Sequence, residues 1–395
     1  MTSTCDTAEF RCRVYGELVR ALCCVFKGKE YKQADNGVSL SDVLSLSASH
    51  KVLLTVFPVL SAYLDSDTAK MWEKEYARRM RQYILQDSEV AKVFSELAQN
   101  GVDVLPIKGY SVRGMYPQNV PRQCGDVDFV YRLEDTDSIN NVMKNNGFVK
   151  KDTDENHSVY VYGDVKIEAH DCITSFSDIV KNYYDNLWDK VIRTPSRHIY
   201  RFSVSDEYIF MVVHTVKHFL DGSAGLRAVT DSYILRKQPE FNRQYVDEQL
   251  SALSLYEFAK NLDALCDEYF GDDDQKKQSA EARPVLEPFF ISSGYITNKS
   301  LCAAYRTYLN KKSGSRIKYY LHMFFLPYGT MKKKYPSLRR FPFLLPFFWI
   351  KRAFDAKRNG GLKEADIPSG FEKETAKKWC KYVDKCGLGS YINKL

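Results

Sequence analysis

The first hundred residues carry apolar side chains at the three- and four-residue spacing of amphipathic helices. The clearest case follows Asp87 and Ser88, either of which can cap a helix, and it ends before Gly101, a typical helix terminator. We therefore predict a helix over residues 87–100. Three earlier apolar or aromatic-rich segments have the same character, namely residues 8–26, 52–64 and 71–85.

The pattern changes to short β-branched and alternating runs after Gly101. Residues 102–107 (VDVLPI) and 126–131 (DVDFVY) predict two strands, and residues 135–146 predict a helix. Residues 159–162 and 165–169 predict a hairpin, because the two residues between them, Gly-Asp, are typical of a tight turn. This order of elements is that of a small α+β unit.

Helical spacing returns after Ser205. Residues 272–283 are polar and predict a surface loop, and residues 372–385 predict a last helix. The predicted fold class is therefore α+β: a small mixed sheet with helices over residues 86–200, embedded between helical regions at 1–85 and 201–395.

Acidic residues interrupt two of the predicted strands. Asp126 and Asp128 project from the same face of an otherwise apolar strand, and Glu168 lies between Ile167 and Ala169 on another. Burying unpaired carboxylates is costly, and a divalent cation compensates for it. If the two strands are neighbours, three carboxylates converge and can hold two metal ions for phosphoryl transfer. Elsewhere, Asp135-x-Asp137 lies among polar residues, where charge is easily solvated.

A Lys-Gly pair follows the first predicted strand. Gly109 lets backbone N–H groups approach a phosphate, and Lys108 adds a positive charge there. An ordinary turn is the alternative interpretation. Arg122, four residues before Asp126, either contacts phosphate oxygens or balances the acids.

Together these residues resemble the bacterial "uncharacterised nucleotidyltransferase" family, a divergent branch of the polymerase-β-like nucleotidyltransferases. The resemblance covers most of the chain beyond residue 80. It rests on residues 105–110 (LPIKGY), 122–130 (RQCGDVDFV), 147–148 (GF), 167–170 (IEAH), 206–207 (DE), 214–218 (HTVKH), 225–227 (GLR) and Asp231.

The resemblance implies a nucleotidyltransferase palm in which Asp126, Asp128 and Glu168 are the catalytic, metal-binding residues. It implies Mg²⁺, with two ions, or Mn²⁺ in its place. Lys108-Gly109 stands where the wider superfamily carries Gly-Ser on its phosphate-binding turn, so Lys108, Gly109 and Arg122 are the expected nucleotide-binding residues.

The expected function is transfer of a nucleoside monophosphate from an NTP, with release of pyrophosphate. The acceptor stays open between a sugar or glycan precursor, an RNA end and a protein hydroxyl. A non-catalytic nucleotide-binding or scaffolding protein on the same palm is the alternative. The stability that buried acids cost counts against this alternative.

Four further residues are weaker candidates. His170 follows Glu168 by two positions, which places it on the same strand face, as a proton acceptor or a packing residue. His214 and His218 are one helical turn apart, a spacing that suits a metal ion, although we favour packing or a substrate contact. Arg227 most simply pairs with Asp231, and its alternative is a nucleotide phosphate.

The net charge of +7 is concentrated in one region. Residues 311–358 hold thirteen Lys and Arg, among them Lys332–Lys334, against one acid, Asp355. Aromatic residues alternate with these charges. Three interpretations fit: an RNA-binding surface, a peripheral contact with an anionic membrane, or aromatic core residues beside solvated lysines. We favour the third, and then the membrane.

Ten cysteines are scattered without any C-x-x-C pair, and the first residues lack the pattern of a secretory signal. These features predict a reducing, cytoplasmic location, with membrane association at most peripheral. No apolar run is long enough for a transmembrane helix.

Overall fold

The computed structural model describes residues 8–153, 157–173, 177–279, 283–292, 335–358 and 373–392, together with residues 325, 328, 331 and 394. The chain divides into two compact units. The first contains residues 1–219, 223–296 and 385–395, and the second contains residues 220–222 and 297–384.

The N-terminal part of the first unit is helical, as expected. Its helices are α1 (Ala8–Lys27), α2 (Leu40–Ser49), α3 (Leu53–Leu60) and α4 (Ser66–Gln99). Side chains of α1, α2 and α3 bury one another, with Leu18, Leu44 and Leu53 fully enclosed. The connection between α2 and α3 is only three residues long, which keeps these two helices in contact.

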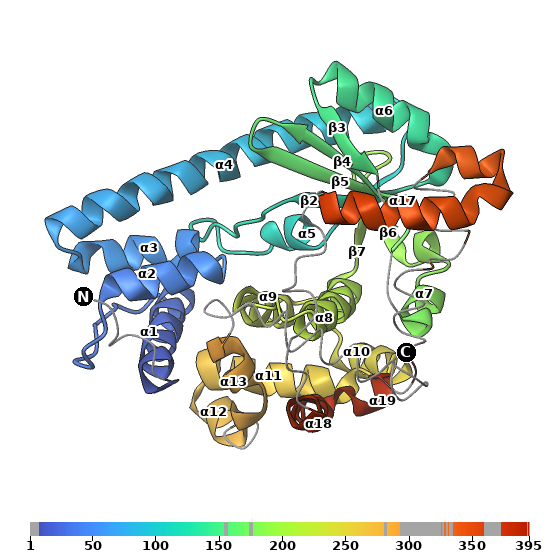
Figure 1. The fold of residues 1–395 in the computed structure, drawn as a ribbon. Coiled ribbons are helices and arrows are strands. Elements are labelled where there is room, and N and C mark those ends of the chain that lie inside the picture. The colour runs from blue at the N-terminus through green and yellow to red at the C-terminus, as the bar shows by residue number, and fades with distance from the viewer. Residues whose placement is uncertain are drawn as a thin grey trace. The chain divides into compact units, whose positions relative to one another are not determined.

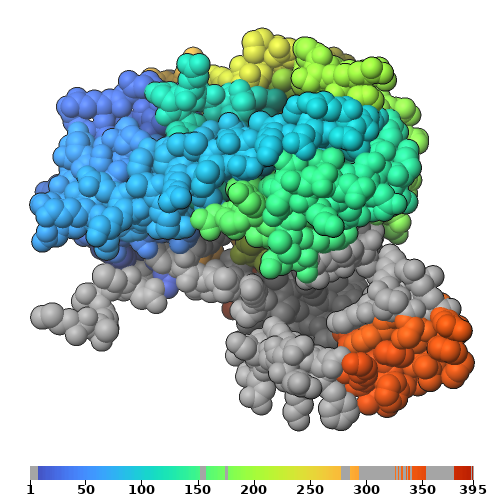
Figure 2. Space-filling model, turned by 90° about the horizontal axis from the view of Figure 1, so that it is seen from above, coloured from blue at the N-terminus to red at the C-terminus, as the bar shows by residue number. Residues whose placement is uncertain are grey.

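Helix α4 corrects one prediction. It is a single helix of 34 residues capped by Asp65, whose side chain accepts from the backbone N–H groups of Asp67 and Thr68, so no new helix begins at residue 87. The expected boundary between residues 85 and 86 therefore lies inside a continuous helix. Figure 1 shows α4 extending from the N-terminal helices to the sheet, and it crosses the face seen in Figure 2 as a light-blue band beside the green residues of α6.

A five-stranded mixed sheet follows, in the order β1-β2-β5-β4-β3. Its members are β1 (Val104–Ile107), β2 (Val127–Tyr131), β3 (Val149–Thr153), β4 (His157–Tyr162) and β5 (Val165–His170). Strands β2 and β5 run parallel, and the other neighbours are antiparallel. The two predicted strands and the hairpin are confirmed to within two residues at each end, and β3 is an additional strand.

One face of the sheet is covered by α4 and by α6 (Thr136–Asn145), and it forms the apolar core of the palm. Val127 and Phe129 of β2 and Ile167 and Ala169 of β5 point into this core. Because side chains alternate along a strand, the residues between them face away from α4 and α6. That opposite face carries the acidic residues.

The remaining elements of the first unit are mainly helical. A short helix, α5 (Gly109–Arg113), follows β1, and β6 (Val191–Arg193) and β7 (Tyr200–Phe202) form a second, two-stranded sheet. The further helices are α7 (Asp178–Tyr183), α8 (Val204–Leu220), α9 (Arg227–Arg236), α10 (Arg243–Ala252), α11 (Tyr256–Phe270), α12 (Asp273–Ser279), α13 (Arg283–Ser292) and α19 (Gly389–Ile392). Helix α12 occupies most of the segment predicted as a loop, so that prediction is wrong.

Short 3₁₀ and π turns separate some of these elements; they are Ser61–Tyr63, Leu133–Asp135, Leu187–Asp189, Pro336–Arg339, Pro342–Leu344 and Asp384–Leu388.

The described helices of the second unit are α17 (Leu345–Arg358) and α18 (Lys373–Val383), the latter confirming the expected last helix. The preferred interpretation of the basic-aromatic segment as buried core is wrong for its described members Phe325 and Phe341, which are 47% and 42% exposed. Lys332–Lys334 lie outside the described residues. None of the described helices combines the length and the apolar character needed to cross a bilayer.

Candidate functional site

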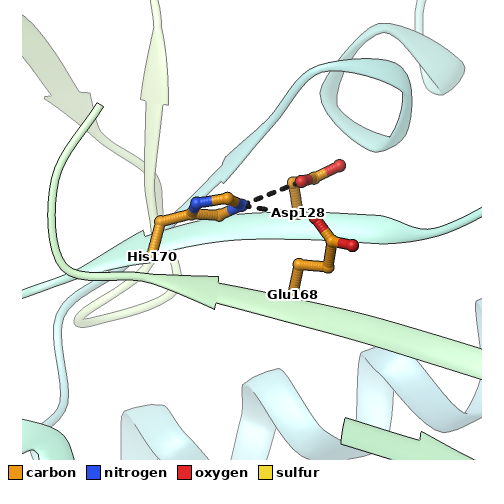
Figure 3. A group of neighbouring side chains, drawn as sticks. All are labelled: Asp128, Glu168 and His170. Atoms are coloured by element: carbon orange, nitrogen blue, oxygen red, sulfur yellow. Dashed lines mark hydrogen bonds and ion pairs between the residues drawn. The ribbon is translucent and has the colours of Figure 1, made fainter. Parts of the chain in front are cut away.

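The register between β2 and β5 brings two acids side by side. Asp128 pairs with Glu168, and Val130 pairs with His170, in a parallel ladder. Asp128, Glu168 and His170 each offer one ligand atom, and these atoms all lie within 4.8 Å of one another (Figure 3). The inference that the two acidic strands are neighbours is thus confirmed by the pairing.

Asp128 is the most deeply buried of these acids, with 3% of its side chain exposed. Its Oδ1 atom accepts from His170 Nε2 at 2.9 Å and from Lys108 Nζ at 2.5 Å. Burial raises the pKa of Asp128, but the hydrogen bond from His170 and the charge of Lys108 outweigh it and lower the pKa below its ordinary value. Asp128 is therefore an anion that these two partners hold in place.

Asp126 lies one residue before β2 and is more exposed, at 43% of its side chain. Lys166, two residues before Glu168 on β5, forms ion pairs with both Glu168 and Asp126, the latter at 3.5 Å. Asp126, Asp128 and Glu168 all line one cleft with a volume of about 370 Å³. Asp126 is not among the tightly grouped ligand atoms, but it opens onto the same space.

The Lys-Gly turn has an unusual backbone. Lys108, directly before α5, has φ 59° and ψ −134°, a region that residues other than glycine rarely adopt. Gly109 is required for another reason: a Cβ there would lie 2.0 Å from Arg122 Nη1 and 2.9 Å from Cys124 Sγ. The side chain of Lys108 reaches Asp128, and the glycine makes room for the guanidinium group of Arg122.

Arg122 is buried and engaged by Asp231 of α9. Its Nε and Nη2 atoms donate to the two carboxylate oxygens at 2.9 and 2.5 Å, and Tyr116 also donates to Asp231 at 2.7 Å. The expected ion pair between Arg227 and Asp231 is therefore wrong. Asp231 pairs with a residue 109 positions away, and Arg227 donates to the backbone carbonyl of Gln123 at 3.0 Å.

His214 and His218 of α8 also line the cleft. Their Nε2 atoms lie 3.0 Å apart, and His218 Nδ1 is 2.8 Å from Ser223 Oγ. Burial, and then the neighbouring His218, lower the pKa of His214 well below its ordinary value, so His214 is neutral at physiological pH. Two imidazoles in hydrogen-bonding contact fit a packing role, as the sequence favoured.

Lys51, Glu207 and Lys217 are among the cleft residues that were not candidate site residues from the sequence, although Glu207 and Lys217 lie in runs that carry the family resemblance. Glu207 is buried beside Ser111, which donates to it at 2.6 Å. Burial raises the pKa of Glu207 to about 8. Lys51 comes from the connection between α2 and α3, and no local sequence signal links it to residues 126–168.

The donor set fits a divalent cation. Carboxylate oxygens are the ligands that Mg²⁺ and Mn²⁺ prefer, and an imidazole nitrogen suits Mn²⁺ better than Mg²⁺. Two lysines already neutralise the acids, so a cation must compete with Lys108 and Lys166 for these carboxylates.

The model of one protein family, described as uncharacterised nucleotidyltransferase, matches residues 36–271. This range is more than half of the chain and contains every cleft residue named above. No curated protein and no solved structure matches the chain.

Proposed function

Because the chain belongs to the uncharacterised nucleotidyltransferase family, we propose that it transfers a nucleoside monophosphate from an NTP to a hydroxyl or phosphate acceptor, releasing pyrophosphate. The observation that carries the proposal is the parallel pairing of Asp128 with Glu168 inside a cleft. Two acids and a histidine on one face of a sheet are costly to bury unless cations compensate for them, and a metal ion can do so in place of Lys108 and Lys166.

In this proposal Asp126, Asp128 and Glu168 hold two divalent ions, with Mg²⁺ as the expected metal. When bound, the ions neutralise the phosphates and favour deprotonation of the acceptor. His170 fixes the orientation of Asp128 through its Nε2 hydrogen bond. The residues of the sheet thus supply a rigid set of anionic ligands.

Lys108 and Arg122 have different roles in the proposal. Lys108 lines the cleft with an ammonium group that suits the phosphates of an NTP. Arg122 is a positioning residue, because its guanidinium is held by Asp231 and packs against Gly109, which fixes the turn. We therefore assign phosphate contact to Lys108 rather than to Arg122.

Transfer of label from an NTP tests the proposal. The protein, Mg²⁺, each NTP labelled at the α-phosphate and a cell extract are incubated, and the labelled product is separated as sugar, RNA or protein. Asp128→Asn should abolish labelling. Asp137→Asn, at an exposed acid on α6, is the matched control and should label as wild type does.

Equal labelling by wild type and Asp128→Asn would contradict the assignment of the site. Tight NTP binding without labelling in any extract would favour the alternative of a non-catalytic nucleotide-binding or scaffolding protein.

A further inference from the structure

Positive charges from outside the sheet also line the cleft. Lys51 comes from the connection between α2 and α3, Lys217 from α8, and Arg227 from the first turn of α9. They share the cleft with Asp126, Asp128 and Glu168. The cleft is therefore built from an acidic sheet face and cationic side chains of the flanking helical regions.

These three cations differ in their partners from Lys108 and Arg122, which also line the cleft, and from Lys166 of β5. Lys108, Lys166 and Arg122 are each paired with a carboxylate. Over the described residues, by contrast, no carboxylate lies within ion-pair distance of Lys51, Lys217 or Arg227. Arg227 donates to a neutral carbonyl, that of Gln123.

The charge of Arg227 acts on Lys51, and the charges of Lys217 and Arg227 act on His214. Burial, followed by the charge of Arg122, lowers the pKa of Arg227, and burial followed by the charge of Arg227 lowers the pKa of Lys51. The charges of Lys217 and Arg227 both help to lower the pKa of the buried His214. The charge of Asp126 offsets part of this effect at Lys51, and that of Asp231 offsets part of it at Arg227. An anion in the cleft relieves the repulsion between like charges that remains.

Lys51 is held in position at a conformational cost. Its φ is 58°, in the left-handed region that lysine rarely adopts. The residues around it are fixed: His50 is buried and accepts the backbone N–H of Leu226 at 3.1 Å, and Val52 is buried. The Lys51 ammonium lies 3.6 Å from the position of a Cβ on Gly125, beside Asp126. The left-handed conformation of Lys51 ends α2, with the Val52 N–H donating to the Ser47 carbonyl at 2.9 Å, and it leaves the Lys51 charge beside Asp126.

We propose that Lys51, Lys217 and Arg227 form a phosphate-binding subsite that takes a phosphoryl anion next to the carboxylates. Two sources have this chemistry, the triphosphate of the NTP and a phosphate group on the acceptor. Assigning the subsite to either one rests on the proposed function, whereas binding of the anion itself does not. The N-terminal helical region then contributes directly to substrate binding.

Inorganic tripolyphosphate, titrated calorimetrically at low salt with EDTA present, tests the subsite without metal or turnover. Lys51→Asn removes the charge, and asparagine tolerates a positive φ better than lysine does. Because one charge-assisted contact is lost, we expect Lys51→Asn to bind tripolyphosphate at least about tenfold more weakly than wild type. Its melting temperature should equal or exceed that of wild type.

The control is Lys260→Asn, the same substitution at an exposed lysine on α11, which should bind tripolyphosphate as wild type does. Arg227→Gln should weaken binding as Lys51→Asn does, and Arg227→Lys should restore part of it. Wild-type protein that binds no tripolyphosphate, or Lys51→Asn protein that binds it as tightly as wild type, would overturn the subsite. Neither result bears on nucleotidyl transfer, which the labelling experiment tests separately.

Competition then identifies the source of the phosphate. Displacement of tripolyphosphate by ATP but not by a hexose 1-phosphate assigns the subsite to the NTP, and the reverse assigns it to the acceptor. Both results support a phosphate subsite.

Discussion

Lys108 and Lys166 place ammonium groups against the carboxylates that the proposed metal site requires. Burial lowers the pKa of Lys166, but its hydrogen bond to Glu168 and the charges of Glu168 and Asp126 outweigh it and raise the pKa. Lys166 is therefore a cation at any physiological pH. It stabilises the metal-free site and competes with a metal ion for the same oxygens.

Removing the charge of Lys166 should strengthen metal binding. For Lys166→Met we expect the Mn²⁺ or Mg²⁺ concentration at half-maximal thermal stabilisation to fall about tenfold, because one competing charge is lost. Lys151→Met, at an exposed lysine of β3 in the same sheet, should leave that concentration unchanged. A weaker metal affinity in Lys166→Met would show that Lys166 supports the site instead of competing for it.

Glu207 should make stability depend on pH. Its pKa rises from 4.5 to about 8 on folding because it is buried. Between these values the folded chain keeps a proton that the unfolded chain has lost, so the free energy of unfolding falls as pH rises, by about 1.4 kcal/mol per pH unit at most. Glu207→Gln should flatten this slope between pH 5 and 8, measured by urea denaturation. An identical slope in the variant would exclude Glu207 as its source.

At the scale of elements, α4 combines two different environments. Its first half has no fully buried side chain, with Met71 54% exposed, and its second half packs on the sheet, with Leu97 fully buried. Leu97→Ala should lower the free energy of unfolding by about 2–5 kcal/mol, whereas Met71→Ala should change it by about 0.5 kcal/mol or less. Chemical denaturation measures both, and equal losses would contradict the division of the helix.

The elements of the palm were predictable because their burial is local. Alternation along residues 127–131 and the two-residue turn at Gly163 follow from the sequence alone. The start of α4 was not predictable, because Asp87 resembles a helix cap. In the structure Asp87 lies within the helix and pairs with Arg113 of α5 at 3.0 Å, a tertiary contact.

Some residues of the candidate site could likewise be predicted from the sequence, and others could not. The acids of β2 and β5 were identified because charges within apolar strands are conspicuous in a sequence. The pairing of Arg122 with Asp231 spans 109 residues, and the nearer Arg227 offered a simpler local partner. Lys51 is separated from the acids in sequence by α3, α4, β1 and α5, and the neighbouring His50 accepts the backbone N–H of the distant Leu226. Neither feature leaves a local pattern.

At the scale of the whole molecule, the second unit exposes apolar side chains among basic residues. Phe343, Phe347 and Ile350 are 74%, 61% and 59% exposed, and Lys351 and Arg352 follow on α17. Aromatic residues beside positive charges suit the interface of an anionic membrane. This surface therefore favours the membrane interpretation of the basic-aromatic segment over a core.

Binding to lipid vesicles tests that interpretation. Wild-type protein should cosediment with vesicles containing phosphatidylserine, less so at high salt, and Phe347→Glu should reduce the bound fraction about tenfold. Ile84→Glu, at an apolar side chain of α4 that is 58% exposed, controls for a general effect of added charge. Equal binding to neutral phosphatidylcholine vesicles, or none to either, would contradict an electrostatic membrane contact.

The parallel pairing of β2 with β5 also has a consequence for folding kinetics. Val127 and Ile167 are neighbours in the sheet but are separated in sequence by α6, β3 and β4, whereas β4 and β5 are joined by a tight turn. Closing the longer loop costs more entropy, so the hairpin should form first and the β2–β5 ladder later. During synthesis, Asp128 and Glu168 therefore cannot pair until the chain has emerged from the ribosome as far as residue 170. The proposed metal site therefore forms in the same step that completes the sheet.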